Sequence, residues 1–184
     1  MHPKLYRTFL ASVLLLLMSA STFAQTPSKQ AISFDLLVTN ATLVTMDASH
    51  RIIENGVIAI RGDSIDFVGT QQEFVLRAMK GYTVRETIDA KGALVLPGFI
   101  NGHTHVPMTL FRGLHDDVTL DDWLRKYIFP AEAKNVTEAF VRWGTRLAAA
   151  EQIRSGVTTF ADMYYFEETV AEETKAAGMR GVLG

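Results

Sequence analysis

The second half of the chain alternates between short apolar runs and amphipathic helical segments, and this pattern constrains the fold more than any other feature. Apolar runs occur at residues 93–101 ("ALVLPGFIN"), 157–163 ("VTTFADM") and 179–184, and helical patterns occupy 136–156 and 168–178 between them. Strand, helix, strand, helix, strand is typical of parallel βαβ units. Because a continuous apolar run is typical of a strand buried on both faces, we expect this half to be α/β.

The helical segments carry their own start and stop signals. Thr119 is an expected N-cap, and Pro130 is expected to end the helix that follows it. Thr137 is the expected cap of the 136–156 helix, and Gly156 and Gly178 close the two later helices. The apolar stripe of the 136–156 helix is expected from Phe140, Trp143, Leu147 and Ala150.

The first half is read as a small sheet over residues 34–93. Val, Leu and Thr are frequent, Asn40 is an expected break, and Gly62 with Asp63 predicts a hairpin turn. Residues 71–81 interrupt the strands with one or two helical turns. A free-standing β domain is the alternative to a half-sandwich. It is disfavoured because the last strand leads into the next segment without a linker.

The length bounds how complete the α/β part can be. A (β/α)8 barrel needs ~250 residues, so residues 94–184 are roughly a third of one. We therefore expect an N-terminal piece: part of a TIM-type (β/α)8 barrel at 94–184, preceded by a small β-sandwich portion at 34–93. A three-stranded open α/β domain is the alternative, and it would leave an exposed strand edge.

The N-terminus is typical of a secretory signal peptide. Lys4 and Arg7 precede a short apolar core at residues 9–18, and the cleavage site is expected after Ala24. The apolar core is about half the ~20 residues that span a bilayer, which disfavours an uncleaved anchor. Residues 1–24 are the predicted signal peptide and 25–33 a linker. The mature protein is then exported, to a bacterial periplasm, with no membrane attachment.

Composition excludes several functions. The formal net charge is −2 with no basic cluster, so nothing indicates a nucleic-acid partner. The chain contains no cysteine, which excludes disulfides, thiolate zinc sites and a cysteine nucleophile. Any metal must therefore be held by nitrogen and oxygen ligands. A small-molecule substrate is the expected partner, and a homo-oligomer is left open.

The segment "LPGFINGHTH" places His103 and His105 directly after an apolar run. In an extended chain this i, i+2 spacing puts both side chains on one face, with Cα atoms ~6.8 Å apart. Two imidazoles can converge from there on one ion at ~2.0–2.1 Å. Chance occurrence is the alternative, and His50 and His115 are expected to be solvated. Since catalytic zinc takes three protein ligands, further ligands are expected beyond Gly184.

These blocks also carry a resemblance. Residues 94–114 ("LVLPGFINGHTHVPMTLFRGL") resemble the opening of the amidohydrolase superfamily. Residues 121–166, with "WLRKYIFPAE" and "IRSGVTTFADMY", are similar to the metal-dependent deaminase and chlorohydrolase branch. That branch includes 5-methylthioadenosine/S-adenosylhomocysteine deaminases and atrazine-type hydrolases. The resemblance implies a barrel packed on a composite β-sandwich, with His103 and His105 as first-strand metal ligands.

The resemblance also assigns substrate-binding residues. Glu132 matches a glutamate that contacts the nucleoside portion of the substrate, which suits a carboxylate that accepts from two ribose hydroxyls. From the residues alone, a solvated charge after the expected helix stop at Pro130 is the favoured alternative. Trp123 and Phe129 could wall an apolar pocket for a base or a thioether, or simply pack the helix. Asp162, at the end of the second strand, is a candidate to support the site, and capping of the next helix is the alternative.

The implied reaction is hydrolytic deamination of a purine nucleoside by metal-activated water. The metal is expected to be one Zn²⁺, although imidazole also suits Fe²⁺ and Mn²⁺. The catalytic acid and base are expected beyond Gly184, so residues 25–184 alone are predicted to be inactive. One alternative is a hydrolase that removes an amine or a halide from guanine, cytosine or triazine rings. A truncated, non-catalytic metal-binding module is another.

Overall fold

The computed structural model describes residues 31–79 and 81–184, which form two compact units that divide between Val95 and Leu96. The predicted signal peptide and its cleavage site lie outside the described residues. The first strand begins at Ile32, inside the segment 25–33 that the sequence predicts to be a linker. In the described part of the chain, no helix combines the length and apolarity needed to cross a membrane.

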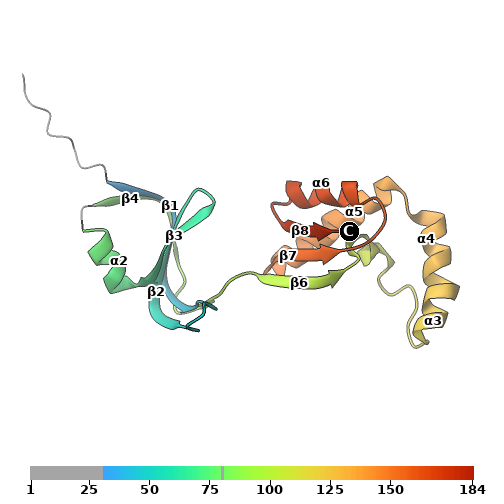
Figure 1. Cartoon of the computed structure of the whole chain (residues 1–184), viewed down its shortest axis with the longest axis horizontal. Coiled ribbons are helices and arrows are strands. Elements are labelled where there is room, and N and C mark those ends of the chain that lie inside the picture. The colour runs from blue at the N-terminus through green and yellow to red at the C-terminus, as the bar shows by residue number, and fades with distance from the viewer. Residues whose placement is uncertain (1–30, 80) are drawn as a thin grey trace, which may run out of the picture. The chain divides into compact units, whose positions relative to one another are not determined.

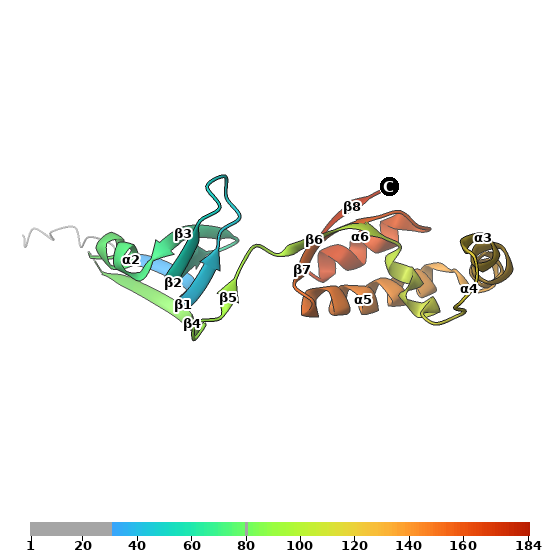
Figure 2. The same cartoon turned by 90° about the horizontal axis from the view of Figure 1, so that it is seen from below.

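The first unit is a five-stranded sheet with one short helix (Figure 2). Its elements are β1 (Ile32–Val44), β2 (Ile52–Arg61), β3 (Ser64–Thr70), α2 (Gln71–Arg77), β4 (Tyr82–Asp89) and β5 (Leu94–Val95). The strand order is β3-β2-β1-β4, with β5 also paired to β1. Strands β1, β2 and β3 are antiparallel neighbours, whereas β4 and β5 run parallel to β1. The predicted small sheet is confirmed.

Local turn chemistry in this unit follows the sequence closely. Gly62 adopts φ +59° in the β2–β3 hairpin, as predicted. Asn40 is not a break, because β1 continues through it with a register irregularity and Asn40 itself at φ 53°. The main core cluster of the unit is made of buried side chains from β1, β2, α2 and its C-cap residue: Phe34, Leu37, Val57, Ala59, Phe74 and Ala78.

The second unit is built on three parallel strands in the order β6-β7-β8 (Figure 1). Its elements are β6 (Phe99–Thr104), η1 (Val106–Phe111), α3 (Leu120–Asp122), η2 (Trp123–Ile128), α4 (Phe129–Asn135), α5 (Glu138–Arg154), β7 (Val157–Asp162), α6 (Glu167–Ala176) and β8 (Arg180–Leu183). The predicted βαβαβ order is confirmed. The sheet is open, so the closed barrel stays a prediction.

The apolar run at 93–101 is not one strand buried on both faces. Leu94 and Val95 form β5 of the first unit, and β6 of the second unit starts only at Phe99. Pro97 lies between them, where it cannot donate a ladder hydrogen bond. Phe99 is 55% and Ile100 75% exposed, because β6 is an edge strand of the open sheet.

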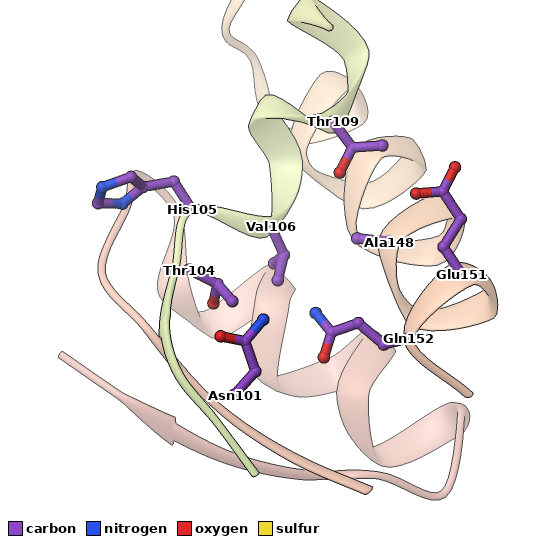
Figure 3. Close-up of a pocket in the computed structure, with 8 residues that line it drawn as sticks. All are labelled: Asn101, Thr104, His105, Val106, Thr109, Ala148, Glu151 and Gln152. Atoms are coloured by element: carbon purple, nitrogen blue, oxygen red, sulfur yellow. The ribbon is translucent and has the colours of Figure 1, made fainter. Parts of the chain in front are cut away.

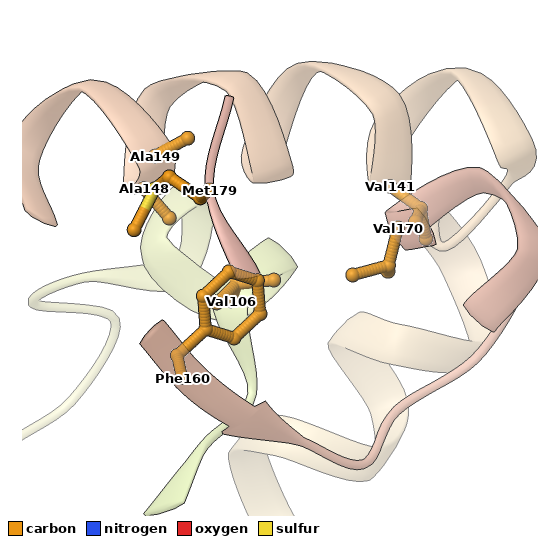
Figure 4. Packing of buried hydrophobic residues seen from close by; sticks show 7 residues of the cluster. All are labelled: Val106, Val141, Ala148, Ala149, Phe160, Val170 and Met179. Carbon is orange, nitrogen blue, oxygen red and sulfur yellow. The ribbon is translucent and has the colours of Figure 1, made fainter. Parts of the chain in front are cut away.

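A compact apolar core lies between the sheet and the two helices that follow β6 and β7 (Figure 4). Its buried members are Val106, Val141, Ala148, Ala149, Phe160, Val170 and Met179. Glu173 of α6 also joins the two helices, because its carboxylate accepts hydrogen bonds from Arg142 and Arg146 of α5. Helices α5 and α6 therefore pack against each other on one face of the sheet (Figure 2).

Helix α5 buries a different face from the predicted one. Thr137 caps the helix and Gly156 follows it at φ +79°, as expected. However, Trp143 is 63% exposed, whereas its neighbour Gly144 is buried. A Cβ at Gly144 would lie 2.5 Å from the Pro107 carbonyl oxygen, so only small residues fit where α5 approaches η1. Trp143 and Leu147 of the predicted stripe are consequently turned outward, whereas Phe140 is partly buried against the core.

Pro130 does not end its helix. Thr119 caps α3 as predicted, but helical structure continues through η2 and α4 to Asn135. Segment η2 is a π-helix, in which the Phe129 N–H donates to the Leu124 carbonyl five residues earlier. This wider turn precedes Pro130, so the missing N–H and the bulk of the proline ring are accommodated.

Candidate active site

His103 and His105 lie at the carboxyl end of β6. His103 belongs to the strand, and His105 is the residue between the strand and η1. Their ring centroids are 5.1 Å apart and the ring planes cross at 78°. Both rings line one cavity of about 790 Å³. The structure thus brings the two imidazoles together at the strand end, as the i, i+2 spacing predicts.

A backbone contact orients the His105 ring. Its Nδ1 lies 2.6 Å from the carbonyl oxygen of Met163, which follows β7. A carbonyl oxygen can only accept, so Nδ1 must carry the proton and donate it. In the neutral ring, Nε2 then keeps its lone pair. This is the arrangement usually found in metal-binding histidines, where the other ring nitrogen is held by a carbonyl or carboxylate.

The donor chemistry of this pair fits a divalent metal, but two imidazoles are not a complete ligand set. Neutral imidazole nitrogen binds zinc and several other divalent ions. Among residues 31–79 and 81–184, no three His, Cys, Asp or Glu side chains group so that they could hold an ion. The pair can supply two ligands of a three-ligand site, and the predicted metal role stays a prediction.

Asp162 joins the ends of β6 and β7. Its side chain is 5% exposed, and Oδ1 accepts hydrogen bonds from the Thr104 hydroxyl at 2.6 Å and from the Val106 N–H at 2.8 Å. Asp162 therefore holds the residues on both sides of His105. Helix α6 begins at Glu167 with Phe166 as its N-cap, so the alternative that Asp162 caps this helix is wrong.

A second carboxyl group lies close to Asp162. Both Asp162 Oδ2 and Glu167 Oε2 are buried, and neither has a hydrogen-bond partner in the described part of the chain. Burial raises the pKa of Glu167, against the hydrogen bond from the Tyr164 N–H that lowers it, and the neighbouring Asp162 carboxyl raises it further. Glu167 therefore keeps its proton to a higher pH than an exposed glutamate does.

Glu132 is a buried carboxylate, not the solvated charge that a helix stop at Pro130 would leave. It lies in α4, is 8% exposed and lines the same cavity as the histidines. The Tyr164 hydroxyl donates to its Oε1 at 2.8 Å. Burial and this hydrogen bond raise the pKa of Tyr164, so the phenol stays a donor. Glu132 Oε2 accepts no hydrogen bond from the described residues and remains available.

Aromatic and apolar side chains complete the cavity wall. Trp123 is half-buried and Phe129 is half-exposed, and both line the cavity together with Met108. Their position beside the histidines and Glu132 is consistent with a wall for a flat ring, in addition to ordinary helix packing.

His50 and His115, the remaining histidines of the described residues, do not line this cavity. His50 is exposed in the β1–β2 turn of the first unit. His115 stacks on Tyr127, with centroids 3.7 Å apart, so it is not simply solvated. Arg112, near the same loop, makes a two-pronged ion pair with Glu151 of α5.

Sequence reasoning missed the residues that follow β7. Met163 and Tyr164 contact His105 and Glu132, respectively, through a backbone carbonyl and a phenol. The available signal was their position at the carboxyl end of the second predicted parallel strand, next to the end of the first. A backbone carbonyl carries no sequence signature, so only the tyrosine could have been proposed.

A smaller cavity of about 240 Å³ lies on the other side of the β6 end (Figure 3). Asn101 and Gln152 face each other across it, and Thr109 and Ala148 line it further along η1 and α5. The His105 ring points away from this group of side chains. The imidazole donors therefore serve the larger cavity.

An open parallel sheet with paired imidazoles at a strand end, facing a cavity with a buried carboxylate, is the arrangement expected of a metal-dependent hydrolase domain. Residues 94–184 match the Amidohydrolase family. The chain belongs to the amidohydrolase family, which confirms the resemblance seen in the histidine block.

Three relatives of known name are similar to this chain over most of its length. The chain is 51% identical over 150 residues to 5-methylthioadenosine/S-adenosylhomocysteine deaminase 1 of Syntrophus aciditrophicus, covering 82% of this chain and 33% of that protein. It is 42% identical to the 5'-deoxyadenosine deaminase of Methanosarcina mazei, covering 81% and 32%. An adenosine deaminase from Xanthomonas campestris, solved with bound zinc, matches with a TM-score of 0.76 and 32% identity, covering 83% and 34%. The chain therefore spans about a third of the length of the relatives it matches.

Proposed function

We propose that this chain carries the first part of the active site of a metal-dependent deaminase of purine nucleosides, of the 5-methylthioadenosine type. The observation that carries the proposal is one cavity lined by His103, His105 and the buried carboxylate of Glu132. This cavity thus combines donors for a metal with an acceptor for a neutral polyhydroxyl group. The relatedness to nucleoside deaminases supports the same conclusion.

His103 and His105 would hold the metal. A divalent ion in such a site supplies Lewis-acid activation of a water molecule for attack on an amine-bearing ring carbon. The contribution of this chain is to present the imidazoles in the required state. The Met163 carbonyl fixes the Nδ1–H tautomer of His105. Zinc is the proposed ion, supported by the zinc-bound adenosine deaminase, and iron or manganese suits the same donors.

Glu132 would hold the ribose. A carboxylate can accept hydrogen bonds from two adjacent hydroxyls, and such charge-assisted bonds are strong when water is excluded. Tyr164 occupies Oε1 from the protein side, which leaves Oε2 for the substrate. This favours a nucleoside over a bare guanine, cytosine or triazine ring, because those rings have no vicinal diol.

Trp123 and Phe129 would wall the base. Aromatic faces stack on flat heterocycles and exclude water around the reacting carbon. The groups that transfer protons are proposed to lie on later strands of the complete polypeptide. Export to the periplasm, a small-molecule substrate and self-association are further parts of the proposal, to be tested by fractionation and by solution mass measurement.

The test uses the complete polypeptide encoded by the gene. His103→Ala together with His105→Ala is expected to lower both bound metal, measured by elemental analysis, and ammonia release from adenosine derivatives. His50→Ala is the matched control, because His50 is exposed in the first unit and should change neither quantity. Full metal content and turnover in the double variant would refute the metal assignment. Turnover of guanine or a triazine, with none of any nucleoside, would refute the substrate class.

A further inference from the structure

The peptide group between Met163 and Tyr164 is held from both sides. Its carbonyl oxygen lies 2.6 Å from Nδ1 of His105, and its N–H donates to Oε1 of Glu167. This peptide is trans and planar, so its C=O and N–H point in opposite directions and can only turn together. The side chain that holds the N–H therefore also sets the direction of the carbonyl that contacts His105.

The other oxygen of Glu167 faces a second carboxyl group. Glu167 Oε2 and Asp162 Oδ2 are both buried and find no donor in the described part of the chain, although the two side chains are within hydrogen-bonding reach of each other. Two ionised carboxylates can only accept and would repel each other, whereas one proton between them gives both oxygens a partner. Burial and the Asp162 carboxyl raise the pKa of Glu167, which favours this protonated form.

Asp162 anchors this carboxyl pair to the neighbouring strand. Its side chain is 5% exposed, and Oδ1 accepts from the Thr104 hydroxyl and the Val106 N–H. The hydrogen bonds thus run from the backbone on both sides of His105 to Asp162, on to Glu167, and back through one peptide group to the His105 ring. Such a closed circuit leaves the ring little freedom to turn.

The turn between β7 and α6 needs contacts of this kind, because its backbone is strained. Phe166 adopts φ 56° and ψ 49°, a left-handed conformation that bulky residues rarely occupy. Its side chain makes no capping hydrogen bond, so helix capping does not account for the conformation. A strained conformation persists only where the surrounding structure holds it. Glu167, the next residue, holds this turn by accepting from the Tyr164 N–H.

We propose that Glu167 is a positioning residue for the metal ligand His105. It shares one proton with Asp162 and directs the Met163 carbonyl at the imidazole, although it does not itself line the cavity of the histidines. The inference rests on the proposed function, because it takes His105 to be a metal ligand. Partners that orient a ligating histidine from outside the coordination sphere contribute about 10–100-fold to metal affinity.

The experiment measures the zinc affinity of the complete polypeptide by competition with a zinc chelator. Glu167→Met keeps the length of the side chain but removes both hydrogen bonds, and it is expected to weaken zinc binding about tenfold or more. Glu167→Gln should keep the affinity of the unmodified protein, because its amide donates to Asp162 Oδ2 and its carbonyl accepts from the Tyr164 N–H. Glu168→Met is the matched control, since Glu168 is the exposed next residue of α6, and it should leave the affinity unchanged.

Glu167→Asp covers the case in which Glu167→Met does not fold. Aspartate is favourable in the first turn of a helix, so α6 keeps its start. Its carboxyl is one methylene shorter and cannot meet Asp162 and the Tyr164 N–H together, so zinc affinity is again expected to fall about tenfold. An unchanged affinity in a folded methionine or aspartate variant would overturn the inference. A glutamine variant that binds zinc as weakly as the methionine variant would overturn it too.

Zinc binding and ammonia release are separate measurements, so the two proposals can fail separately. If the unmodified protein binds zinc but releases no ammonia from any nucleoside, the proposed function is refuted, and the zinc affinities of the variants still decide the role of Glu167. If the unmodified protein binds no zinc, the metal assignment and the role of Glu167 are both refuted.

Discussion

Replacing Asp162 with alanine should destabilise the second unit, because it removes the acceptor that joins β6 to β7. Oδ1 of Asp162 receives the Val106 N–H at 2.8 Å and the Thr104 hydroxyl at 2.6 Å. Val106 is 4% exposed, so water cannot replace the lost acceptor. The Thr104 hydroxyl also lies 2.7 Å from the Ala161 carbonyl oxygen and keeps that partner. The Val106 N–H is therefore the group left unsatisfied.

The size of this destabilisation follows from the hydrogen-bond partners that are lost and kept. A buried donor left without an acceptor costs about 1–3 kcal/mol. Part of that cost is offset, because the Asp162 carboxyl is itself buried with Oδ2 unpaired beside Glu167. We expect a net loss of about 2 kcal/mol in the free energy of unfolding, which corresponds to about 4–8 °C in Tm for a chain of this size.

Urea unfolding followed by tryptophan fluorescence measures this change in the relevant unit, since Trp123 and Trp143 both lie in it. Asp162→Asn is the matched control. Its carbonyl oxygen can still accept from Val106, and its amide can donate to the unpaired Glu167 oxygen. The asparagine variant should be as stable as the unmodified chain to within about 0.5 kcal/mol. An alanine variant equally stable, or an asparagine variant as unstable as alanine, would refute the reasoning.

Three further changes test other contacts. Glu167 has a pKa raised above 4.5, so its stabilising contribution is complete below pH 4.5 and is lost as pH rises through the raised value. Glu167→Gln should remove that loss, because glutamine does not titrate. The urea midpoint of the unmodified chain should therefore fall, relative to that of the variant, as pH rises through the window. Gly144→Ala should cost about 1–3 kcal/mol, because the new Cβ would meet the Pro107 carbonyl at 2.5 Å. At a helix site with free space, replacing glycine with alanine instead stabilises by about 1 kcal/mol. A lower urea midpoint would therefore support the close contact, and a higher one would contradict it. Tyr164→Phe should raise KM for the nucleoside about tenfold with a smaller effect on kcat, because Glu132 loses a charge-assisted hydrogen bond. Equal losses in kcat, or an unchanged KM, would contradict this positioning role.

The parts of the fold that the sequence predicts correctly depend on local chemistry. Thr119 and Thr137 accept from backbone N–H groups at the expected helix starts. Gly62, Gly156 and Gly178 adopt positive φ at the expected turns and helix ends. Each of these features is decided within three or four residues, so neighbouring residue types are sufficient to predict it.

The wrong predictions concern partners that lie far away in the sequence. The predicted stripe of α5 has the right period, but the face that is buried depends on how closely η1 approaches Gly144. Pro130 fails as a stop because the preceding π-helical turn makes room for it, and residue types alone do not reveal that turn. Glu132 consequently changes from a solvated charge to a buried group of the candidate site.

The candidate site likewise depends partly on neighbouring residues and partly on residues distant in sequence. The histidine spacing predicts two neighbouring rings, but their orientation comes from the carboxyl end of β7. Three consecutive residues there each fix one component: Asp162 holds the Val106 backbone, the Met163 carbonyl holds the His105 ring, and the Tyr164 hydroxyl holds Glu132. Parallel pairing of β6 with β7 brings these residues beside the histidines. A one-residue slip in that pairing would therefore disturb the proposed metal ligands and the proposed substrate carboxylate together, although neither belongs to β7.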